Sequence, residues 1–490
     1  MPDDALFAVA AIREIESRFA SPPEDGSVLM RRAGLAAWQA VLEHWPQAQR
    51  ILVVCGPGNN GADGYLLAAH ALASGREVRV MRLPTHPPRS DLAQLACDEY
   101  GVRDGLVDVF SDRLPSADLV VDALFGIGLS RPPDRDAARL VEAINAQTAP
   151  VLSLDVPSGI DADRGTAPGV AVRATRTLKF IAPKAGLRTG PALDHVGAGS
   201  VARLDLLPTL FRELEPAALS LEPSRLAHWL KPRSRNSHKG SSGRVLCVGG
   251  DRAHGGAILL TAQAALRSGA GLLKVSTHAD NRAPLLARLP EAMAIDGDND
   301  EGWEWADVIA IGPGLGQGDW GQRLLQRALG YDRPLLLDAD ALNLLPRQAA
   351  LLPAGSVLTP HPGEAARLLG IDVAAVQSDR FAAARSLSDT FRAVVVLKGA
   401  GTVVTAPGQC PRVIDAGNPG MAVGGMGDVL SGVIAALMAQ GLAAFDAACC
   451  GALLHATAGD RAAAEGGERG LLPTDLMRWL RRLANPVLRS

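Results

Sequence analysis

Short apolar runs alternate along the chain with longer segments in which polar and apolar residues are mixed. The runs include Ile51–Cys55 and Val151–Asp155 in the first half, and Arg244–Val248 and Leu272–Thr277 in the second. Because few polar residues interrupt them, these runs are typical of strands buried on both faces of a parallel sheet. The mixed segments, such as 134–147, have helical spacing. The pattern predicts an α/β fold built from doubly wound sheets.

A break in this alternation indicates two domains. The pattern becomes irregular over residues 208–231, and a strand, a glycine loop and a helix begin again after His238. A chain of 490 residues has room for two or three domains. We therefore predict domains at residues 1–217 and 222–490, with a linker near residues 216–221.

A glycine-rich loop follows the first of these strands. It reads Gly56-Pro-Gly-Asn-Asn-Gly-Ala-Asp-Gly64 and leads into a helix expected over residues 65–74. A strand, a glycine loop and a helix in this order form the phosphate-binding arrangement of doubly wound folds. A simple structural turn is the alternative, but such a turn does not require the polar side chains of Asn59, Asn60 and Asp63.

Oxygen-bearing side chains lie just beyond three predicted strands of the first half, at Asn60, Asp122 and Asp155. The carboxyl ends of parallel strands share one edge of the sheet, where ligands bind. Together with Ser158, these oxygens could coordinate a hard cation. Helix capping is the alternative role for the aspartates, but it explains Asp155 poorly because Pro157 follows so closely.

Two lysines further along, Lys179 and Lys184, could face the same edge of the first sheet, although solvent exposure is the default expectation for a lysine. In the second half, Asp338 and Asp340 lie one residue apart after an apolar run. Such a pair could bind Mg²⁺, or it could cap the helix that follows.

Further polar groups of the second half follow its predicted strands. His361 lies between two prolines that stiffen the backbone around it, which favours a ligand contact over a place in the core. Lys398 precedes a tight glycine turn at residues 399–401, where a nucleotide phosphate or ribose could bind.

The most informative stretch is the glycine-rich segment from Asp415 to Gly432. The helix expected at Val429–Leu437 follows glycines at positions 417, 420, 424, 425 and 427. Free backbone N–H groups and a helix N-terminus would meet here, which favours binding of an anion. Asp428 stands at the start of this helix. An isolated aspartate there is usually an N-cap, but a carboxylate beside a phosphate-binding loop suggests a role in proton transfer.

Composition and charge narrow the function classes. The formal net charge of −3 gives no electrostatic reason to expect nucleic acid or an anionic membrane as a partner. The six cysteines are scattered, which favours a reducing compartment, and the acidic N-terminus does not resemble a signal peptide. We expect a cytoplasmic homo-oligomer that binds small molecules, and neither nucleic acid nor membrane.

The string from Asn418 to Asp428 resembles the anion-hole loop of ribokinase-like kinases, and most closely that of the NAD(P)H-hydrate dehydratases. The resemblance covers residues 225–490 and implies a ribokinase-like second domain that uses ADP or ATP with Mg²⁺. It implies substrate contacts at Ala257, Gly314, His361 and Asp428. It implies nucleotide contacts at Lys398, Gly399, Ala400, Gly401, Thr402 and Gly427.

The first half resembles the NAD(P)H-hydrate epimerases over residues 5–207, through Asn59–Asp63, Gly126–Pro132 and Asp155–Gly159. This implies a Rossmann-like α/β/α sandwich with K⁺ held by Asn60, Asp122 and Ser158. The implied substrate contacts are Asn59, Asn60, Gly61, Ala62, Asp63, Gly126, Ile127, Gly128, Leu129, Ser130, Arg131, Pro132 and Asp155. Ala62 replaces the glycine usual in that family, at a cost of about 1–2 kcal/mol if φ is positive there.

The two resemblances together predict a bifunctional nicotinamide nucleotide repair enzyme. The first domain would interconvert the R and S hydrates of NADH and NADPH, with Asp155 as the acid or base. The second would dehydrate the S form at the expense of ADP or ATP, giving AMP or ADP and phosphate, with Asp428 as the base. The alternative is a kinase of a vitamin alcohol, joined to a binding module that has no catalytic activity.

Overall fold

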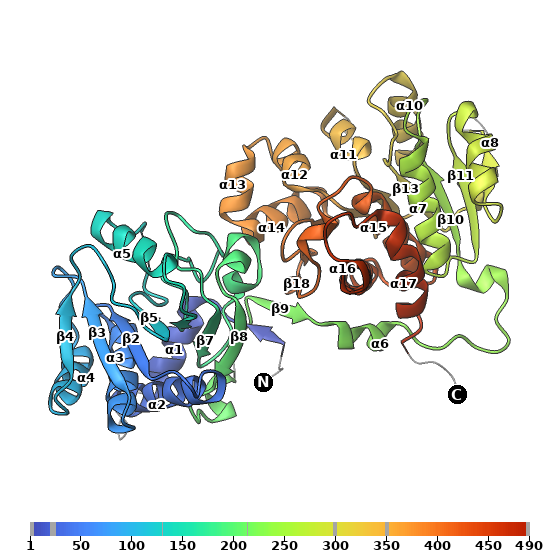
Figure 1. The fold of residues 1–490 in the computed structure, drawn as a ribbon. Coiled ribbons are helices and arrows are strands. Elements are labelled where there is room, and N and C mark those ends of the chain that lie inside the picture. The colour runs from blue at the N-terminus through green and yellow to red at the C-terminus, as the bar shows by residue number, and fades with distance from the viewer. Residues whose placement is uncertain are drawn as a thin grey trace. The chain divides into compact units, whose positions relative to one another are not determined.

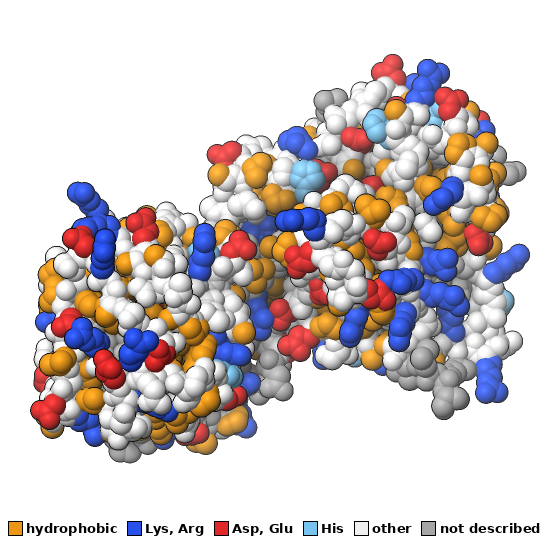
Figure 2. Space-filling view, viewed as in Figure 1, with side chains coloured by type: hydrophobic (Ala, Val, Ile, Leu, Met, Phe, Trp, Pro, Cys, Tyr) orange, Lys and Arg blue, Asp and Glu red, His pale blue; other side chains and the backbone are white. Residues whose placement is uncertain are grey.

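Two compact units make up the chain, Met1–Ala218 and Leu219–Ser490 (Figure 1). The computed structural model describes residues 4–19, 26–129, 131–212, 214–296, 301–347 and 352–486. Among these residues, every helix is too short or too polar to cross a bilayer. On the face drawn in Figure 2, basic and acidic side chains are interspersed.

The first unit contains a parallel sheet with the strand order β4-β3-β2-β5-β6-β7-β8. Its strands are β2 (Arg50–Cys55), β3 (Glu77–Arg82), β4 (Leu106–Val109), β5 (Leu119–Ala123), β6 (Val151–Leu154), β7 (Arg176–Phe180) and β8 (Ala198–Ala202), and a short strand, β1 (Ala5–Leu6), precedes them. The helices are α1 (Val9–Phe19), α2 (Gly26–His44), α3 (Asn59–Ala73), α4 (Asp91–Gly101) and α5 (Arg135–Asn145).

Both faces of this sheet are covered, as the uninterrupted apolar strands predict. On one face, Leu52 and Val54 of β2 pack in one cluster with Leu140 and Ile144 of α5. On the other face, α3 lies so close to the sheet that a methyl group added at Gly64 would be 2.6 Å from the Ala123 side chain. Alternate residues of a strand point to opposite faces, so the apolar run is needed to fill both layers.

The second unit contains a larger sheet with the order β9-β18-β17-β16-β15-β14-β13-β10-β11-β12. Its strands are β9 (Ala218–Leu221), β10 (Arg244–Val248), β11 (Leu272–Ser276), β12 (Met293–Ile295), β13 (Val308–Ile311), β14 (Leu335–Leu337), β15 (Val357–Leu358), β16 (Val394–Leu397), β17 (Val403–Thr405) and β18 (Arg412–Ile414). The β17 strand is antiparallel to both of its neighbours, and the other pairs are parallel.

Helices surround this second sheet. They are α6 (Leu226–Trp229), α7 (Gly255–Arg267), α8 (Ala279–Arg288), α9 (Glu301–Trp305), α10 (Asp319–Leu329), α11 (Asp340–Leu344), α12 (Pro362–Leu369), α13 (Val373–Ser378), α14 (Arg380–Phe391), α15 (Met426–Ala439), α16 (Ala444–Gly466) and α17 (Leu476–Leu483). The α15 helix is buried on nearly all sides between α7 and α16. Its composition is accordingly apolar around its whole circumference.

The α/β fold with two doubly wound units is as predicted, but two local expectations are wrong. Residues 218–221, expected within a linker, form β9 and pair in parallel with β18. Their alternating pattern is short and follows a proline, so the strand signal is weak. The helix expected from Tyr65 begins at Asn59 instead. Glycines usually indicate a loop, so Gly61 and Gly64 argued against a helix at this point. In the structure they do not interrupt α3, and their lack of a side chain lets the start of the helix pack closely.

Close packing of α15 on α7 gives a stability prediction. A methyl group at Gly432 would be 2.1 Å from the Thr261 carbonyl oxygen, which belongs to the backbone and cannot rotate away. We expect Gly432→Ala to destabilise the protein by about 1–3 kcal/mol, measured by denaturant-induced unfolding. Gly256→Ala on α7 is the matched control, since a methyl there meets no described atom within 4 Å. Equal stability of Gly432→Ala and the control would contradict the prediction.

Candidate functional sites

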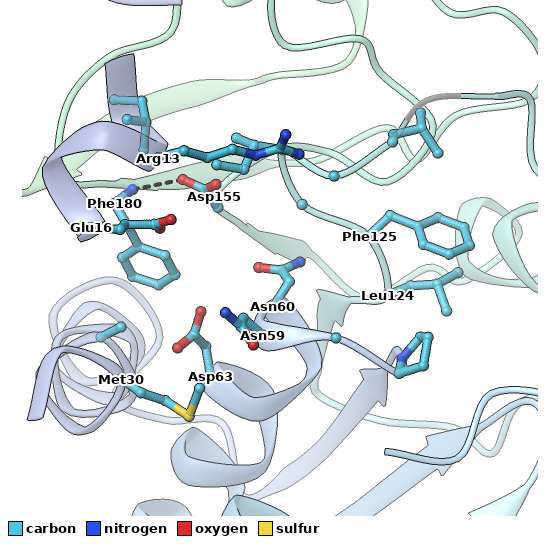
Figure 3. A pocket seen from close by; sticks show the side chains of 18 of the residues that line it. Arg13, Glu16, Met30, Asn59, Asn60, Asp63, Leu124, Phe125, Asp155 and Phe180 are labelled. Atoms are coloured by element: carbon cyan, nitrogen blue, oxygen red, sulfur yellow. Dashed lines mark hydrogen bonds between the residues drawn. The ribbon is translucent and has the colours of Figure 1, made fainter. Parts of the chain in front are cut away.

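A cavity of about 860 Å³ opens at the carboxyl edge of the first sheet. Figure 3 shows its polar side chains converging from α1, from the start of α3 and from the loops that follow the strands. The predicted contacts that line it are Asn59, Asn60, Asp63, Gly126, Ile127, Gly128, Leu129, Arg131, Pro132 and Asp155. Gly61 and Ala62 are not among the lining residues, and Ser130 lies outside the described residues.

Gly61 and Ala62 lie on the side of α3 that packs into the protein. A methyl group at Gly61 would be only 2.0 Å from the Gly56 carbonyl oxygen, so this position requires glycine for space. Ala62 is completely buried and does not occur among the residues with positive φ. The strain considered for Ala62 therefore does not arise.

Asp155 is held at the inner end of the cavity by a buried ion pair. Lys184, which is completely buried, donates to Asp155 Oδ1 and to the Phe180 carbonyl oxygen, the latter at 2.8 Å. The Phe180 N–H also donates to Asp155 Oδ1, at 3.0 Å. Turns follow Asp155, so it is not a helix cap, and its φ of +64° is one that side chains rarely adopt. The default expectation of exposed lysines is wrong here, because Lys179 and Lys184 are both buried.

Asp122, near the end of β5, is completely buried in a dense hydrogen-bond network. Its carboxylate accepts from the Ser158 hydroxyl at 2.6 Å, from the Ser158 N–H at 2.9 Å and from the Ser153 hydroxyl at 2.8 Å. Burial raises the pKa of Asp122, and the hydrogen bonds from Ser158 and Ser153 oppose this. The Phe125 N–H donates to the Ser158 hydroxyl oxygen at 2.7 Å, so the loop after β5 is tied to the same network.

Asn60 differs from its neighbours because its amide is unsatisfied. Both Asn60 Oδ1 and Nδ2 are buried and have no hydrogen-bond partner within the described parts of the chain. Gly126, next to the Asp122–Ser158 network, packs directly on Asn60. A buried polar atom without a partner is costly, so this position is suited to an external ligand or ion.

A second group of polar residues assembles at the carboxyl edge of the second sheet. Lys398 follows β16 and donates to Asp338 Oδ1 at 2.6 Å, while the Ser431 hydroxyl of α15 donates to Asp338 Oδ2 at 2.8 Å. Burial of Asp338 is outweighed by Lys398, which keeps the pKa of this carboxyl below its usual value. Glu364 lies 3.8 Å from the same lysine, and burial raises its pKa to about 7.

Asp428 lies in the first turn of α15, beside this pair. The N-cap position is occupied by Gly425, whose φ is +96°, so Asp428 is not the N-cap of this helix. Burial raises the pKa of Asp428 to about 6, with Asp338 adding to the shift and Lys398 opposing it. A methyl group at Gly427 would be 3.2 Å from Lys398 Nζ, so glycine keeps the space above the lysine open.

The remaining predicted residues surround the same edge. Gly314, with φ +61°, lies against Ala257, and Asp340 accepts from the Gly316 N–H at 2.9 Å. His361 is the N-cap of α12, where its Nδ1 accepts from the Gly363 N–H at 2.9 Å. The geometry thus gives His361 a structural role and leaves half of its side chain exposed.

The turn at 398–402 presents backbone groups to solvent. Gly399 and Gly401 have φ of +133° and +61°, and the Thr402 hydroxyl donates to the Gly399 carbonyl oxygen at 3.0 Å. The buried guanidinium of Arg380 donates to the carbonyl oxygens of residues 397 and 398, each at 3.2 Å. Nothing in the sequence pattern of α14 pointed to this support of the turn.

Comparison with known proteins identifies both units. Residues 245–482 match the family model described as NAD(P)H-hydrate dehydratase, and residues 26–186 match that of the YjeF-related protein N-terminus. A bifunctional NAD(P)H-hydrate repair enzyme of Escherichia coli (strain K12) is 46% identical over 465 residues, covering 94% of this chain and 89% of that protein. The chain belongs to the bifunctional NAD(P)H-hydrate repair enzymes.

Solved structures agree with this membership for the second unit of the repair enzyme. A ribokinase-like superfamily protein of Enterococcus faecalis is 32% identical, with a TM-score of 0.52, and covers 56% of this chain and 97% of its own. The ADP/ATP-dependent NAD(P)H-hydrate dehydratase of Bacillus subtilis, co-crystallised with ATP and Mg²⁺, is 31% identical, with a TM-score of 0.50, and covers 54% and 96%. The ribokinase-like fold and the family resemblance are confirmed, and the vitamin-kinase alternative is not supported.

The Asp338–Lys398 pair gives a second stability prediction. Lys398→Met should cost about 3–5 kcal/mol near neutral pH, because it leaves the 1%-exposed Asp338 carboxylate without its cation. The loss should shrink as the pH falls toward about 4, where the unpaired carboxyl gains a proton. The double variant Lys398→Met/Asp338→Asn, which has no buried charge at this point, should recover most of the loss. Denaturant unfolding at several pH values measures all three, and a pH-independent loss would contradict the explanation.

Proposed function

We propose that residues 1–217 interconvert the R and S epimers of the hydrates of NADH and NADPH, called NADHX and NADPHX. We propose that residues 222–490 dehydrate the S epimer at the expense of ADP or ATP. The observation that carries this proposal is the presence of one polar site at the carboxyl edge of each sheet. The site of the first unit is the cavity that contains Asp155. The site of the second is the cluster of Asp428 with the Asp338–Lys398 pair.

The dehydration follows from the weakness of hydroxide as a leaving group. Phosphorylation converts the C6 hydroxyl into a good leaving group, which the ring nitrogen then expels. Asp428, partly buried at the start of α15, would take the hydroxyl proton as phosphate is transferred. The N–H groups of residues 424–427 and the N-terminus of α15 would stabilise the transferring charge.

The nucleotide and its metal fit the same edge. Residues Lys398–Thr402 and Gly427 would bind the nucleotide, and Ala257, Gly314 and His361 would contact the hydrate. Within the described residues no cluster of three or more acidic, histidine or cysteine side chains could hold a metal. This suits Mg²⁺, which often binds mainly through phosphate oxygens and would neutralise their charge.

In the first unit, Asp155 would act as acid or base at the ring, and Asn60, Asp122 and Ser158 would hold K⁺. The unsatisfied Asn60 oxygen and the buried Asp122 carboxylate are the kind of oxygen donors that a hard cation requires. The cation would hold the loop after β5 in place. Gly126–Pro132 and Asn59–Asp63 would then surround the hydrate.

We also propose that the protein works in the cytoplasm as a homo-oligomer, with neither nucleic acid nor membrane as a partner. None of the six cysteines, all of which lie in the described residues, forms a disulfide, which suits a reducing compartment. The net charge of −3 gives no electrostatic attraction to polyanions.

The base role of Asp428 predicts both a variant effect and a pH dependence. Asp428→Asn should reduce kcat for dehydration of the S epimer by about 10²–10⁴-fold. In the wild type, kcat/KM should fall as the pH drops through about 6, because the carboxylate must be ionised to accept a proton. Steady-state kinetics from a common folded preparation measures both, and near wild-type dehydration by Asp428→Asn would refute the assignment.

The division of labour is tested with a mixed R/S hydrate preparation. Absorbance of the reduced nicotinamide ring is followed after adding the protein, K⁺, Mg²⁺ and ADP or ATP. The wild type should recover essentially all the NADH, after spontaneous epimerisation is subtracted, whereas Asp155→Asn should stop near the S fraction. Accumulation of a stable phosphorylated product without NADH would favour the kinase alternative.

A further inference from the structure

Glu16 lines the cavity but lies outside all three motifs of the first unit. It lies on α1, and its carboxylate points into the cavity toward Asp63 and Asp155 (Figure 3). Lys184 completes a group of three carboxylates and one ammonium, which come from α1, from α3 and from the segments that follow β6 and β7.

The charges of this group do not balance if every member is ionised. Lys184 neutralises Asp155 through the buried ion pair, which leaves Glu16 and Asp63 as two carboxyls close to a third. Arg13 also lines the cavity, but its side chain is exposed to solvent. Like charges gathered in a partly dry cavity favour retention of a proton on one of them.

Glu16 and Asp63 are also not engaged in holding the fold together. Asp63 is 91% buried, its exposed fraction being 9%, yet its carboxylate has no hydrogen-bond partner among the described residues. The same holds for Glu16 within the described parts of the chain. Two carboxyls that point into a cavity and have no hydrogen-bond partner within the described residues are available to a ligand.

Electrostatics agrees with this geometry. Burial raises the pKa of Glu16, Asp155 raises it further, and Lys184 and Arg13 oppose the shift. Burial likewise raises the pKa of Asp63 well above its usual value, with Asp155 and Glu16 adding to the shift. The carboxyls therefore keep a proton at a higher pH than free acids would.

We propose that Glu16 is the catalytic acid of epimerisation, acting together with Asp155. This proposal rests on the epimerase function proposed above. Asp155 accepts the proton of the C6 hydroxyl, a C6=O double bond forms, and the C6–N1 bond breaks. The electron pair of that bond moves to N1, which takes the proton of Glu16. Rotation of the freed aldehyde and reversal of the same steps close the ring with C6 inverted, and both protons return.

Ring opening is the route that keeps epimerisation separate from dehydration. If the hydroxyl left as water, the ring would carry an iminium whose loss of a C5 proton gives the reduced nicotinamide directly. An epimerase acting through that species would release NADH without nucleotide. Placing the acid at N1, and not at the hydroxyl oxygen, avoids this outcome. The carboxyl of Glu16 enters the cavity from α1, beside Asp155, so the two carboxyls can reach neighbouring atoms of one ring (Figure 3).

The experiment compares Glu16→Gln with Glu14→Gln in the full-length protein. Glu14 is on the same helix, and its 50%-exposed side chain pairs with Arg18, so it is a matched control. With the R epimer, K⁺, Mg²⁺ and ADP or ATP, Glu16→Gln should lower kcat for NADH formation by about 10²–10⁴-fold with a similar KM. Its rate with the S epimer, and both rates of Glu14→Gln, should match the wild type.

The outcomes distinguish a failure of the role of Glu16 from a failure of the epimerase function. An R-epimer rate for Glu16→Gln within about twofold of the wild type would overturn the role of Glu16. A wild type that converts only the S epimer would instead refute the epimerase function itself. Should Glu16→Gln lose its folded structure, the wild-type pH profile decides. Because the acid must be protonated, kcat with the R epimer should fall as the pH rises, relative to kcat with the S epimer, and a ratio of the two rates that does not change with pH would overturn the proposal.

Discussion

A buried lysine neutralises a buried aspartate at the carboxyl edge of each sheet, and the geometry of both sites depends on these pairs. Lys184 binds Asp155 in the first unit, and Lys398 binds Asp338 in the second. A buried carboxylate is costly unless a cation or several hydrogen bonds compensate it, and in these two places the cation does so. In both units the lysine follows a later strand than its aspartate does, so each pair also joins segments that are separate in the sequence.

Each of these lysines lies near more carboxyls than its single positive charge can neutralise. Glu16 and Asp63 remain around one pair, and Glu364 and Asp428 around the other. Burial raises the pKa of these carboxyls and the neighbouring carboxylates raise it further, which brings proton exchange closer to neutral pH. The two sheets have different strand orders, yet in both sites one lysine faces more than one carboxyl within a confined space.

The sequence located those polar residues of the two sites that follow a strand end or a glycine loop. Asp155 and Asp428 could be found because an apolar run or a glycine loop marks each position in the chain. Lys184 and Glu16 could not be found in this way, because burial of a lysine depends on its tertiary partner, and α1 has an ordinary amphipathic pattern. The strand at residues 218–221 was missed for a similar reason: four residues carry too little pattern to outweigh the loop-like composition around them.

Asp155 has a consequence for how the protein tolerates change. With φ at +64°, an aspartate costs about 1–2 kcal/mol relative to glycine, which adopts this conformation freely. Backbone preference at this position therefore favours the residue that has no carboxylate. Removal of the carboxylate, however, would leave the buried Lys184 without its anion, at a cost of about 3–5 kcal/mol that exceeds the gain from glycine. The ion pair therefore retains an aspartate where the backbone alone would select glycine, and a substitution at Lys184 would remove that constraint.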